Sequence, residues 1–565
     1  MKTVRKVIRQ PDGIVIAAYT IIIIVMTWPL LLHFDTHILG PFKTDNFELL
    51  WKMWWVPHAV FEQGQNPFLV PTVYYPSGYE LVLGELTPLH TFLLAPLTWL
   101  TNEVVTYNVS FFVSAPLSGW LVYRLAQRWL SALAPENKQL VLYTAFFAGA
   151  AFAFSAYRIQ KGIGGHLNLI PTQFVILAFL GLDRWLDERR LRDVVLAGLG
   201  FALGALSSWY YLYIPLLILP IYLLLRVGSL TTFVRDRRTW LAALIVAMIV
   251  GGLVIPFALP YLRFDQTSDG IPLGQASFWS ASPIDYLLPN PGHPLWGGLV
   301  QRVLWPFPGD MPLEFMIPAL DLVTLIFGVW AWRRLEGQRW RALRWSIIAA
   351  FLLSLGPVFH LSRLPLGVPM PAALVRLILP GADNLRTWGR FSLFVTFGMS
   401  LMAAGGLLLW LREATPNRQR ISIVIAVVAL LFINWGGSAE LVDTKPRPVD
   451  LWLNEQPDDF AVMQYPIESA LTGSSVFYAR FHNKPIIYAT GTFFNLQFVE
   501  QHSDIVAFPD SVAQQALLER DVRYVLVDTT NLEEADFTLE DVERQSWLRH
   551  IITLGEQQVY EILPT

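Results

Sequence analysis

The sequence predicts a mainly α-helical polytopic membrane protein with a small α/β domain at its C-terminal end. Of the 565 residues, 54% are hydrophobic and only 15% are charged, a balance outside the range of soluble domains. Apolar runs of bilayer length recur up to residue 437, and short β-type segments with charged helical ones follow. We therefore expect about eleven transmembrane helices in residues 1–437 and a soluble domain in residues 438–565.

The first predicted span follows four basic residues and contains about twenty apolar ones, the length that a bilayer core requires. It ends in Trp28-Pro29-Leu30 and lacks the small residues of a cleavage site, so we expect an uncleaved helix and not a signal peptide. Ten further apolar runs complete the predicted set: 104–124, 140–156, 167–184, 194–208, 210–226, 240–261, 315–332, 345–361, 391–411 and 421–437.

The basic residues orient these spans. With the N-terminus in the cytoplasm, 23 of the 41 Lys and Arg residues fall in cytoplasmic segments and 10 in outside loops, and the remaining 8 lie in the C-terminal domain. This asymmetry follows the positive-inside rule. It predicts a plasma-membrane protein whose loops 34–103, 157–166, 262–314 and 362–390 and whose C-terminal domain are extracytoplasmic. The apolar run 86–100 is predicted as an interfacial or re-entrant helix, because a further span there would invert the later loops.

The composition excludes several classes of function. The net charge of −3 and the scattered basic residues predict no nucleic-acid partner. The absence of cysteine excludes disulfides, thiolate metal sites and cysteine nucleophiles. His33 and His37 have only Asp35 as an acidic companion, so the histidines predict no metal site.

Carboxylates mark the first outside loop, 34–103. Asp45 and Glu48 share one face if the stretch after Thr44 is a helix. A carboxylate beside a membrane surface can accept a proton from an acceptor hydroxyl, because partial desolvation raises its basicity. The alternative is that Asp45 only places charge in the first turn of an interfacial helix.

Basic residues mark two later outside loops. Arg158, Lys161 and His166 lie in a glycine-rich loop, and Arg386 and Arg390 precede a span at helical spacing. Such residues suit an anionic phosphate. The alternative is that the long basic side chains extend to the membrane interface from helix ends.

Several segments, taken in order, resemble the GT-C superfamily of integral-membrane glycosyltransferases, and most closely a bacterial multi-pass branch of it. They are TDNFELLWKMWW, NPFLVPTVYYPSGYELVLGE, AFSAYRIQKGIGGHLNL, SLGP, LPGADNLRTWGRF and YPI…YARFHNKPIIYATG. The resemblance implies transfer of a hexosyl or pentosyl group from a polyprenyl-phosphate donor to an extracytoplasmic hydroxyl of a glycan, lipid or protein, usually with inversion.

By the same resemblance, Asp45 corresponds to the general base, and Arg158, Lys161, Arg386 and Arg390 to the phosphate-binding residues. Many members have two adjacent acidic residues at the first-loop site, whereas Asn46 follows Asp45 here. Glu48 and Glu85 are therefore candidates for a second carboxylate. No cofactor is certain, and a divalent metal is the one candidate.

Two other classes remain open at this point. One is a non-catalytic membrane scaffold or assembly protein that acts through its outer domain. The other is a transporter or flippase for lipid-linked cargo, although the charged residues gather in loops and no two halves match, unlike the arrangement typical of transporters.

Overall fold

The computed structural model describes residues 10–42, 45–265, 270–305, 307, 320–362, 364–437, 440–491 and 495–564. The chain divides into two compact units. The first contains Met1–Leu31 and Val109–Ala439, and we call it the helical unit. The second contains Leu32–Asn108 and Glu440–Thr565, and we call it the loop–tail unit.

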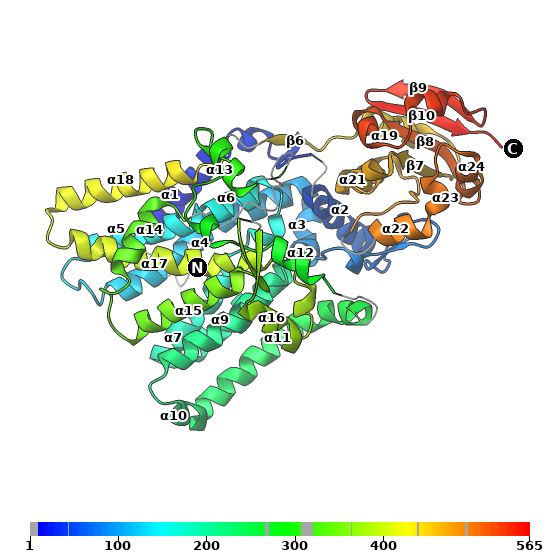
Figure 1. Cartoon of the computed structure of the whole chain (residues 1–565). Helices are drawn as coiled ribbons and strands as arrows, with labels where there is room; N and C mark the ends of the chain where they lie inside the picture. Colours follow the sequence, from blue (N-terminus) through cyan, green and yellow to red (C-terminus); the bar gives the residue numbers. More distant parts are fainter. Residues whose placement is uncertain are drawn as a thin grey trace. The chain divides into compact units, whose positions relative to one another are not determined.

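All eleven predicted apolar runs contain a helix in the structure (Figure 1). These helices are α1 (Gln10–Met26), α4 (Glu103–Leu130), α5 (Lys138–Ala153), α7 (Gln173–Glu188), α8 (Leu191–Ser207), α9 (Tyr210–Arg226), α11 (Arg237–Asp265), α14 (Leu322–Ala331), α15 (Gln338–Ser354), α17 (Ser392–Leu411) and α18 (Pro416–Asn434). Six stretches of the described chain are long and apolar enough to cross a membrane, and three shorter apolar helices accompany them. The number of eleven crossings stays a prediction.

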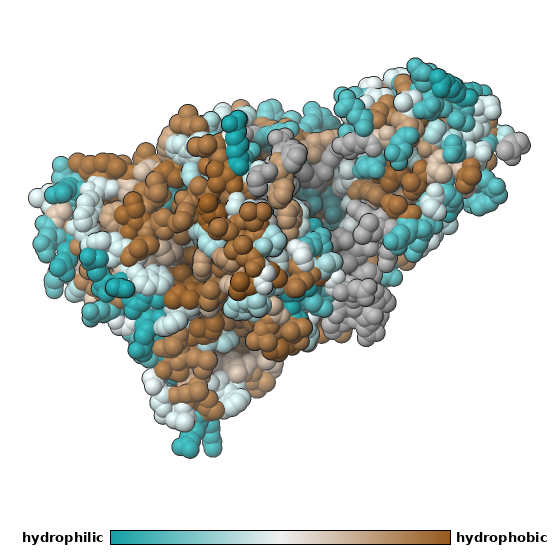
Figure 2. Space-filling view, in the orientation of Figure 1, coloured by the Kyte–Doolittle hydropathy of each residue, from teal (hydrophilic) through white to brown (hydrophobic). Residues whose placement is uncertain are grey.

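Apolar side chains cover much of the face of the helical unit that Figure 2 shows. Only 11% of the apolar window of α11 and 28% of that of α18 is buried, against 94% for the window that contains α17. A helix whose apolar side chains face outward is stable in lipid and costly in water. Helices α11 and α18 therefore expose apolar side chains, whereas α17 is buried within the helical unit.

A buried carboxylate joins four helices of this unit. Asp183 of α7 accepts hydrogen bonds from Trp129 Nε1 of α4 at 2.9 Å and from the Tyr222 hydroxyl of α9 at 2.7 Å. Arg339 of α15 donates to the same carboxylate at 3.2 Å. A fully buried charge is tolerated where partners of this kind satisfy it, so Asp183 fixes how α4, α7, α9 and α15 pack.

Shorter elements connect the long helices. They are α6 (Ala156–Ile163), η6 (Leu167–Leu169), α10 (Leu230–Arg235), α12 (Leu273–Phe278), η7 (Pro283–Tyr286), α13 (Gly297–Leu304), β4 (Val358–Leu361), β5 (Leu364–Pro369), α16 (Pro371–Ile378), η9 (Ala382–Asn384) and η10 (Trp388–Phe391). Strands β4 and β5 form an antiparallel hairpin. The elements α6, η6, η9 and η10 carry or flank the predicted basic residues.

The tail contributes a four-stranded mixed sheet of order β7-β8-β10-β9. Strand β7 (Ala461–Tyr465) is parallel to β8 (Val522–Asp528), and β10 (Gln557–Ile562) is antiparallel to both β8 and β9 (Leu548–Leu554). The surrounding helices are α19 (Pro448–Glu455), α20 (Ile467–Ala470), α21 (Gly473–His482), α22 (Asn495–Gln501), α23 (Ser503–Val506), α24 (Ser511–Leu518) and α25 (Leu539–Glu543).

The first loop folds together with this tail. Its elements include β1 (His37–Leu39), α2 (Asp45–Pro57), η3 (His58–Glu62), β2 (Leu69–Val70), β3 (Tyr79–Glu80), η4 (Leu81–Leu83), η5 (Leu89–Leu93) and α3 (Ala95–Leu100). Strand β1 pairs antiparallel with β6 (Leu441–Asp443). Ile486 N donates to Thr72 O at 2.9 Å, and the Tyr79 hydroxyl donates to Thr490 O at 2.7 Å.

This grouping differs from the linear division expected at residues 437 and 438. Long-range pairing brings residues 32–108 into one compact unit with the tail, and only the boundary before residue 440 is similar to the expected one. The run 86–100 contains η5 and α3, of which α3 has six residues. A helix of that length is too short to span a bilayer.

Candidate functional site

Helix α2 presents the candidate carboxylates. Asp45 is its first residue and its side chain is exposed, and Glu48 lies one turn later on the same face. Glu48 forms an ion pair with Lys52, whose side chain is only 1% exposed. Lys52 Nζ also donates to Glu85 O at 3.2 Å. Lys52 thus neutralises Glu48. Thr44, which precedes Asp45 in the sequence, lies outside the described residues.

The residue after Asp45 has a structural role. Asn46 is fully buried, and its Oδ1 accepts a hydrogen bond from Phe47 N at 2.9 Å. Its Nδ2 donates to Pro41 O at 3.4 Å. An amide held in this way is not available as the second acidic ligand, and Glu48 is already paired with Lys52.

The donor set of α2 therefore does not fit a divalent metal, which prefers several converging oxygen ligands. Within the described ranges, no group of three or more His, Asp or Glu side chains is arranged to hold a metal ion. We derive no step that uses a metal.

The helical unit brings four predicted basic residues together. Lys161 lies near the end of α6, His166 lies just before η6, Arg386 precedes η10 and Arg390 lies within η10. Lys161, His166 and Arg390 are 2%, 5% and 8% exposed. The charges of Lys161, Arg390 and Arg386 all act on the His166 ring. We call these four residues the basic cluster.

Burial and the neighbouring positive charges hold the pKa of His166 well below its usual range, burial being the larger cause. His166 is therefore neutral at pH 7. Three cations around a neutral imidazole, with little solvent to screen them, make the surroundings of this ring favourable for an anion. A phosphate is the anion that converging Arg and Lys side chains bind best.

Aromatic rings support both arginines of the cluster. The Arg390 guanidinium lies 4.1 Å from the ring centroid of Tyr210, and that of Arg386 lies 5.1 Å from a ring centroid of Trp279. The Tyr210 hydroxyl accepts a hydrogen bond from Thr387 N at 2.9 Å. Each ring contacts the face of a guanidinium, so it orients the arginine through that face and not through a hydrogen bond.

Arg158 differs from the other basic residues. Its guanidinium is buried and donates to Ala153 O at 3.1 Å, Ile170 O at 3.0 Å, Ser118 Oγ at 3.0 Å and Ser114 Oγ at 3.2 Å. These bonds join the end of α5, the segment before α7 and helix α4. The side chain is thus used in helix packing.

Sequence reasoning missed three residues of this arrangement. Lys52 follows Glu48 by four residues, the spacing of an ion pair on one helix face, and this signal was available. Tyr210 and Trp279 carry no local signal, because the sequence has 19 Tyr and 22 Trp residues and most of them suit a membrane interface equally well.

Three solved structures show what the fold is similar to. The Archaeoglobus fulgidus oligosaccharyltransferase in its apo form is 15% identical with a TM-score of 0.52, over 92% of this chain and 70% of that chain. The arabinofuranosyltransferase AftD from Mycobacteria is 13% identical with a TM-score of 0.60, over 99% and 40%. ArnT from Cupriavidus metallidurans bound to undecaprenyl phosphate is 13% identical with a TM-score of 0.52, over 97% and 97%.

The chain thus has the fold of the GT-C superfamily of integral-membrane glycosyltransferases, and the resemblance predicted from the sequence is confirmed at the level of fold. A scan against models of protein families gave no match. A search of curated protein sequences gave none either. At identities of 12–15%, the structural likeness shows the fold and does not identify the reaction.

Proposed function

We propose that the protein is a membrane glycosyltransferase that transfers a hexosyl or pentosyl group from a polyprenyl-phosphate donor to an extracytoplasmic acceptor hydroxyl. The basic cluster carries this proposal, because it gathers three cations and a neutral imidazole in a buried part of a GT-C fold. Converging Lys and Arg side chains match the oxygens and the charge of a phosphate.

The donor phosphate binds to the basic cluster in this proposal. Lys161, Arg386 and Arg390 donate hydrogen bonds to its oxygens and hold the negative charge that grows as the phosphate leaves. His166 stays neutral before binding and contributes one ring N–H. Arg158 has a structural role in place of the phosphate-binding role expected from the sequence, because its donors already bond within the helical unit.

Asp45 is the proposed general base. Its carboxylate accepts the proton of the acceptor hydroxyl as the hydroxyl oxygen forms a bond to the anomeric carbon of the sugar. The bond from that carbon to the carrier phosphate breaks, and the phosphate leaves with the electron pair, so the anomeric configuration is inverted. A positioned base of this kind contributes about 10² to 10⁴ in rate.

The ligands of similar structures support this choice of donor. One of them is bound to undecaprenyl phosphate, and another is in complex with an inhibitory peptide and a dolichol-phosphate. Both carriers join a long prenyl chain to a phosphate, and the basic cluster within an apolar unit has the chemistry to bind such a molecule. The acceptor hydroxyl belongs to a glycan, a lipid or a protein.

Turnover of labelled donors tests the proposal. The purified full-length protein in lipid nanodiscs is incubated with polyprenyl-phosphate sugars that carry a radiolabelled hexose or pentose, together with a membrane extract as acceptor source. Release of unlabelled polyprenyl phosphate with transfer of the label supports the enzyme. Binding without transfer supports a lipid-linked cargo transporter or flippase, and neither binding nor transfer supports a scaffold.

A further inference from the structure

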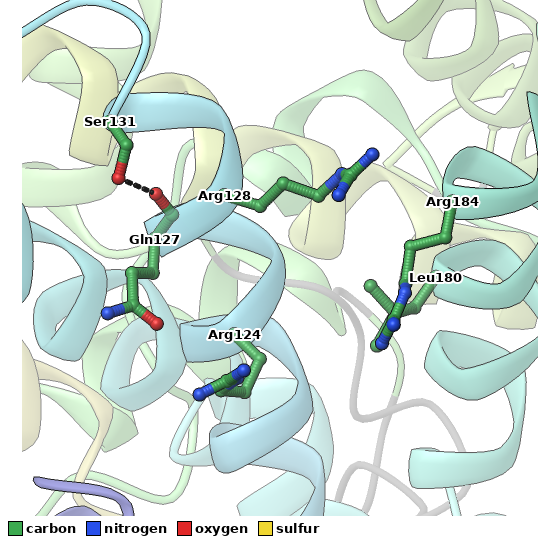
Figure 3. Close-up of a pocket in the computed structure, with 6 residues that line it drawn as sticks. All are labelled: Arg124, Gln127, Arg128, Ser131, Leu180 and Arg184. Carbon is green, nitrogen blue, oxygen red and sulfur yellow. Dashed lines mark hydrogen bonds between the residues drawn. The ribbon is translucent and has the colours of Figure 1, made fainter. Parts of the chain in front are cut away.

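A second group of arginines surrounds a cavity near the C-terminal ends of α4 and α7. The cavity has a volume of about 290 Å³ and is lined by Arg124, Gln127 and Arg128 of α4, the following Ser131, and Leu180 and Arg184 of α7. Figure 3 shows side chains from the two helices around this space. Arg184 lies 11 residues after Gln173, the first residue of α7. It is therefore about 16 Å along the helix from the end that is nearer in sequence to His166.

This cavity adjoins a second one, since the two share lining residues. The second cavity has a volume of about 390 Å³ and shares Arg124, Gln127 and Ser131 with the first. Its other lining residues are largely apolar and come from α1, α4, the segment after it and α5: Pro11, Asp12, Tyr123, Ala134, Pro135, Lys138, Val141 and Leu142. A cavity lined by arginines thus adjoins a largely apolar one, an arrangement that suits an amphiphile.

The charges of the first cavity favour an anion. Three arginines and no carboxylate line it. Arg128 is engaged by Asp187 at 2.7 Å and by Glu188 at 2.6 Å. Among the described residues, Arg184 makes one ion pair, from Nε to Asp193 at 3.1 Å, which leaves both of its terminal nitrogens as donors.

Arg124 also has N–H groups that can bind a ligand. It contacts both oxygens of Asp12 through Nη1 alone, at 3.2 and 3.0 Å. The side chains of Arg124 and Arg184 are 39% and 28% exposed, so a ligand can reach them. Planar guanidinium groups with free N–H edges match the oxygens of a phosphate.

We infer that this cavity binds a phosphate group, and that the adjoining apolar cavity accepts the chain of the phospholipid that carries it. The positive-inside prediction places this end of α4 and α7 at the cytoplasmic leaflet, where anionic lipids attract basic residues. The site is separate from the basic cluster, and it would bind a lipid of the membrane and not the sugar donor.

Lipid preference tests the inference. The full-length protein is purified from nanodiscs that contain phosphatidylglycerol and phosphatidylcholine in equal amounts, and the retained lipids are counted by mass spectrometry. Because one basic residue near an anionic surface contributes roughly fivefold in affinity, two predict a preference for phosphatidylglycerol on the order of thirtyfold.

The variants keep local charge balanced so that the protein folds. Arg184→Gln with Asp193→Asn, and Arg124→Gln with Asp12→Asn, each remove an arginine together with its buried partner, and each is expected to lower the preference about fivefold. Arg192→Gln, an exposed arginine at the start of α8, is the control and should leave the preference unchanged.

Inorganic phosphate separates the two sources of the phosphate group. In nanodiscs of phosphatidylcholine alone, a rise in Tm with inorganic phosphate that the paired variants abolish would assign the cavity to soluble phosphates as well as lipids. A rise in Tm in nanodiscs that contain phosphatidylglycerol, with no rise on addition of inorganic phosphate, would assign the cavity to the lipid. Equal retention of both lipids with no effect of inorganic phosphate, or an unchanged preference in both paired variants, overturns the inference.

Discussion

Lys52 lies against Glu48 and donates to Glu85 O at 3.2 Å, so one buried ammonium group joins helix α2 to the segment after η4. Glu48 and Glu85 were both candidates for a second catalytic carboxylate. Lys52 contacts the carboxylate of Glu48 and the backbone oxygen of Glu85, so it anchors α2 and neutralises the Glu48 carboxylate.

Replacing the buried ammonium should cost stability more than it costs catalysis. Lys52→Met leaves Glu48 without its partner in a largely buried setting, and we expect a loss of about 3 kcal/mol in the free energy of unfolding. The paired variant Lys52→Met with Glu48→Gln should recover most of that loss. Thermal unfolding of the purified variants measures both, and equal Tm values for the single and paired variants would contradict this role.

The arginines of the basic cluster should control donor binding. Arg390→Gln or Arg386→Gln removes a charge-assisted hydrogen bond to the phosphate, and we expect the KM for the polyprenyl-phosphate sugar to rise about 10- to 100-fold. Arg302→Gln, an exposed arginine of α13, is the matched control. A KM that changes equally in the variants and the control would argue against a phosphate site.

Arg158 should behave differently from those arginines. Arg158→Met removes buried bonds that join three segments of the helical unit, and we expect a loss of about 2 to 4 kcal/mol in stability. The protein that remains folded at low temperature should have nearly the same KM for the donor. Donor titrations below the lowered Tm check this, and a KM that rises as much as in Arg390→Gln would restore Arg158 to the phosphate site.

Acid should destabilise the loop–tail unit. Burial lowers the pKa of His482 to about 4, below its unfolded value of about 6.5. Between these values the unfolded chain binds more protons, so stability is full above pH 6.5 and falls as the pH is lowered toward 4, by at most about 3 kcal/mol. Denaturant unfolding at pH 7.5 and pH 4.5 measures the difference, which His482→Gln should reduce. An unchanged difference in this variant would exclude His482 as its source.

Chelation should leave transfer unaffected. The carboxylates near Asp45 do not form a ligand set for a divalent ion, since Asn46 is buried and Glu48 is paired with Lys52. We expect turnover in EDTA to stay within about twofold of the untreated rate, which is below the loss that follows removal of one catalytic group. Loss of turnover with EDTA and its recovery with Mg²⁺ or Mn²⁺ would overturn this expectation.

The apolar runs of the sequence predicted the helices, but they did not predict that the first loop and the tail form one compact unit. Apolar runs report on local structure, and every predicted run contains a helix. The union of the first loop with the tail depends on contacts such as that of Tyr79 with Thr490, which are 411 residues apart. No local pattern encodes a pairing of that kind, so the linear division at residue 437 missed it.

The sequence also predicted part of the candidate site. Positive charge in outside loops selected Lys161, His166, Arg386 and Arg390, which the structure brings together. The same signal selected Arg158, whose donors bond to Ser114, Ser118 and backbone carbonyls instead. Whether a guanidinium faces a ligand or its own helices depends on tertiary packing, which charge and spacing do not reveal.

The role of Asp45 as general base is tested by the transfer rate of Asp45→Asn, compared with that of Asp35→Asn, an exposed carboxylate on the same loop. Both variants are assayed in nanodiscs with a saturating labelled polyprenyl-phosphate sugar, after equal Tm values have shown that they are folded. If Asp45 is the general base, Asp45→Asn lowers the rate about 100-fold or more and Asp35→Asn leaves it nearly unchanged. Transfer by folded Asp45→Asn at the wild-type rate would contradict it.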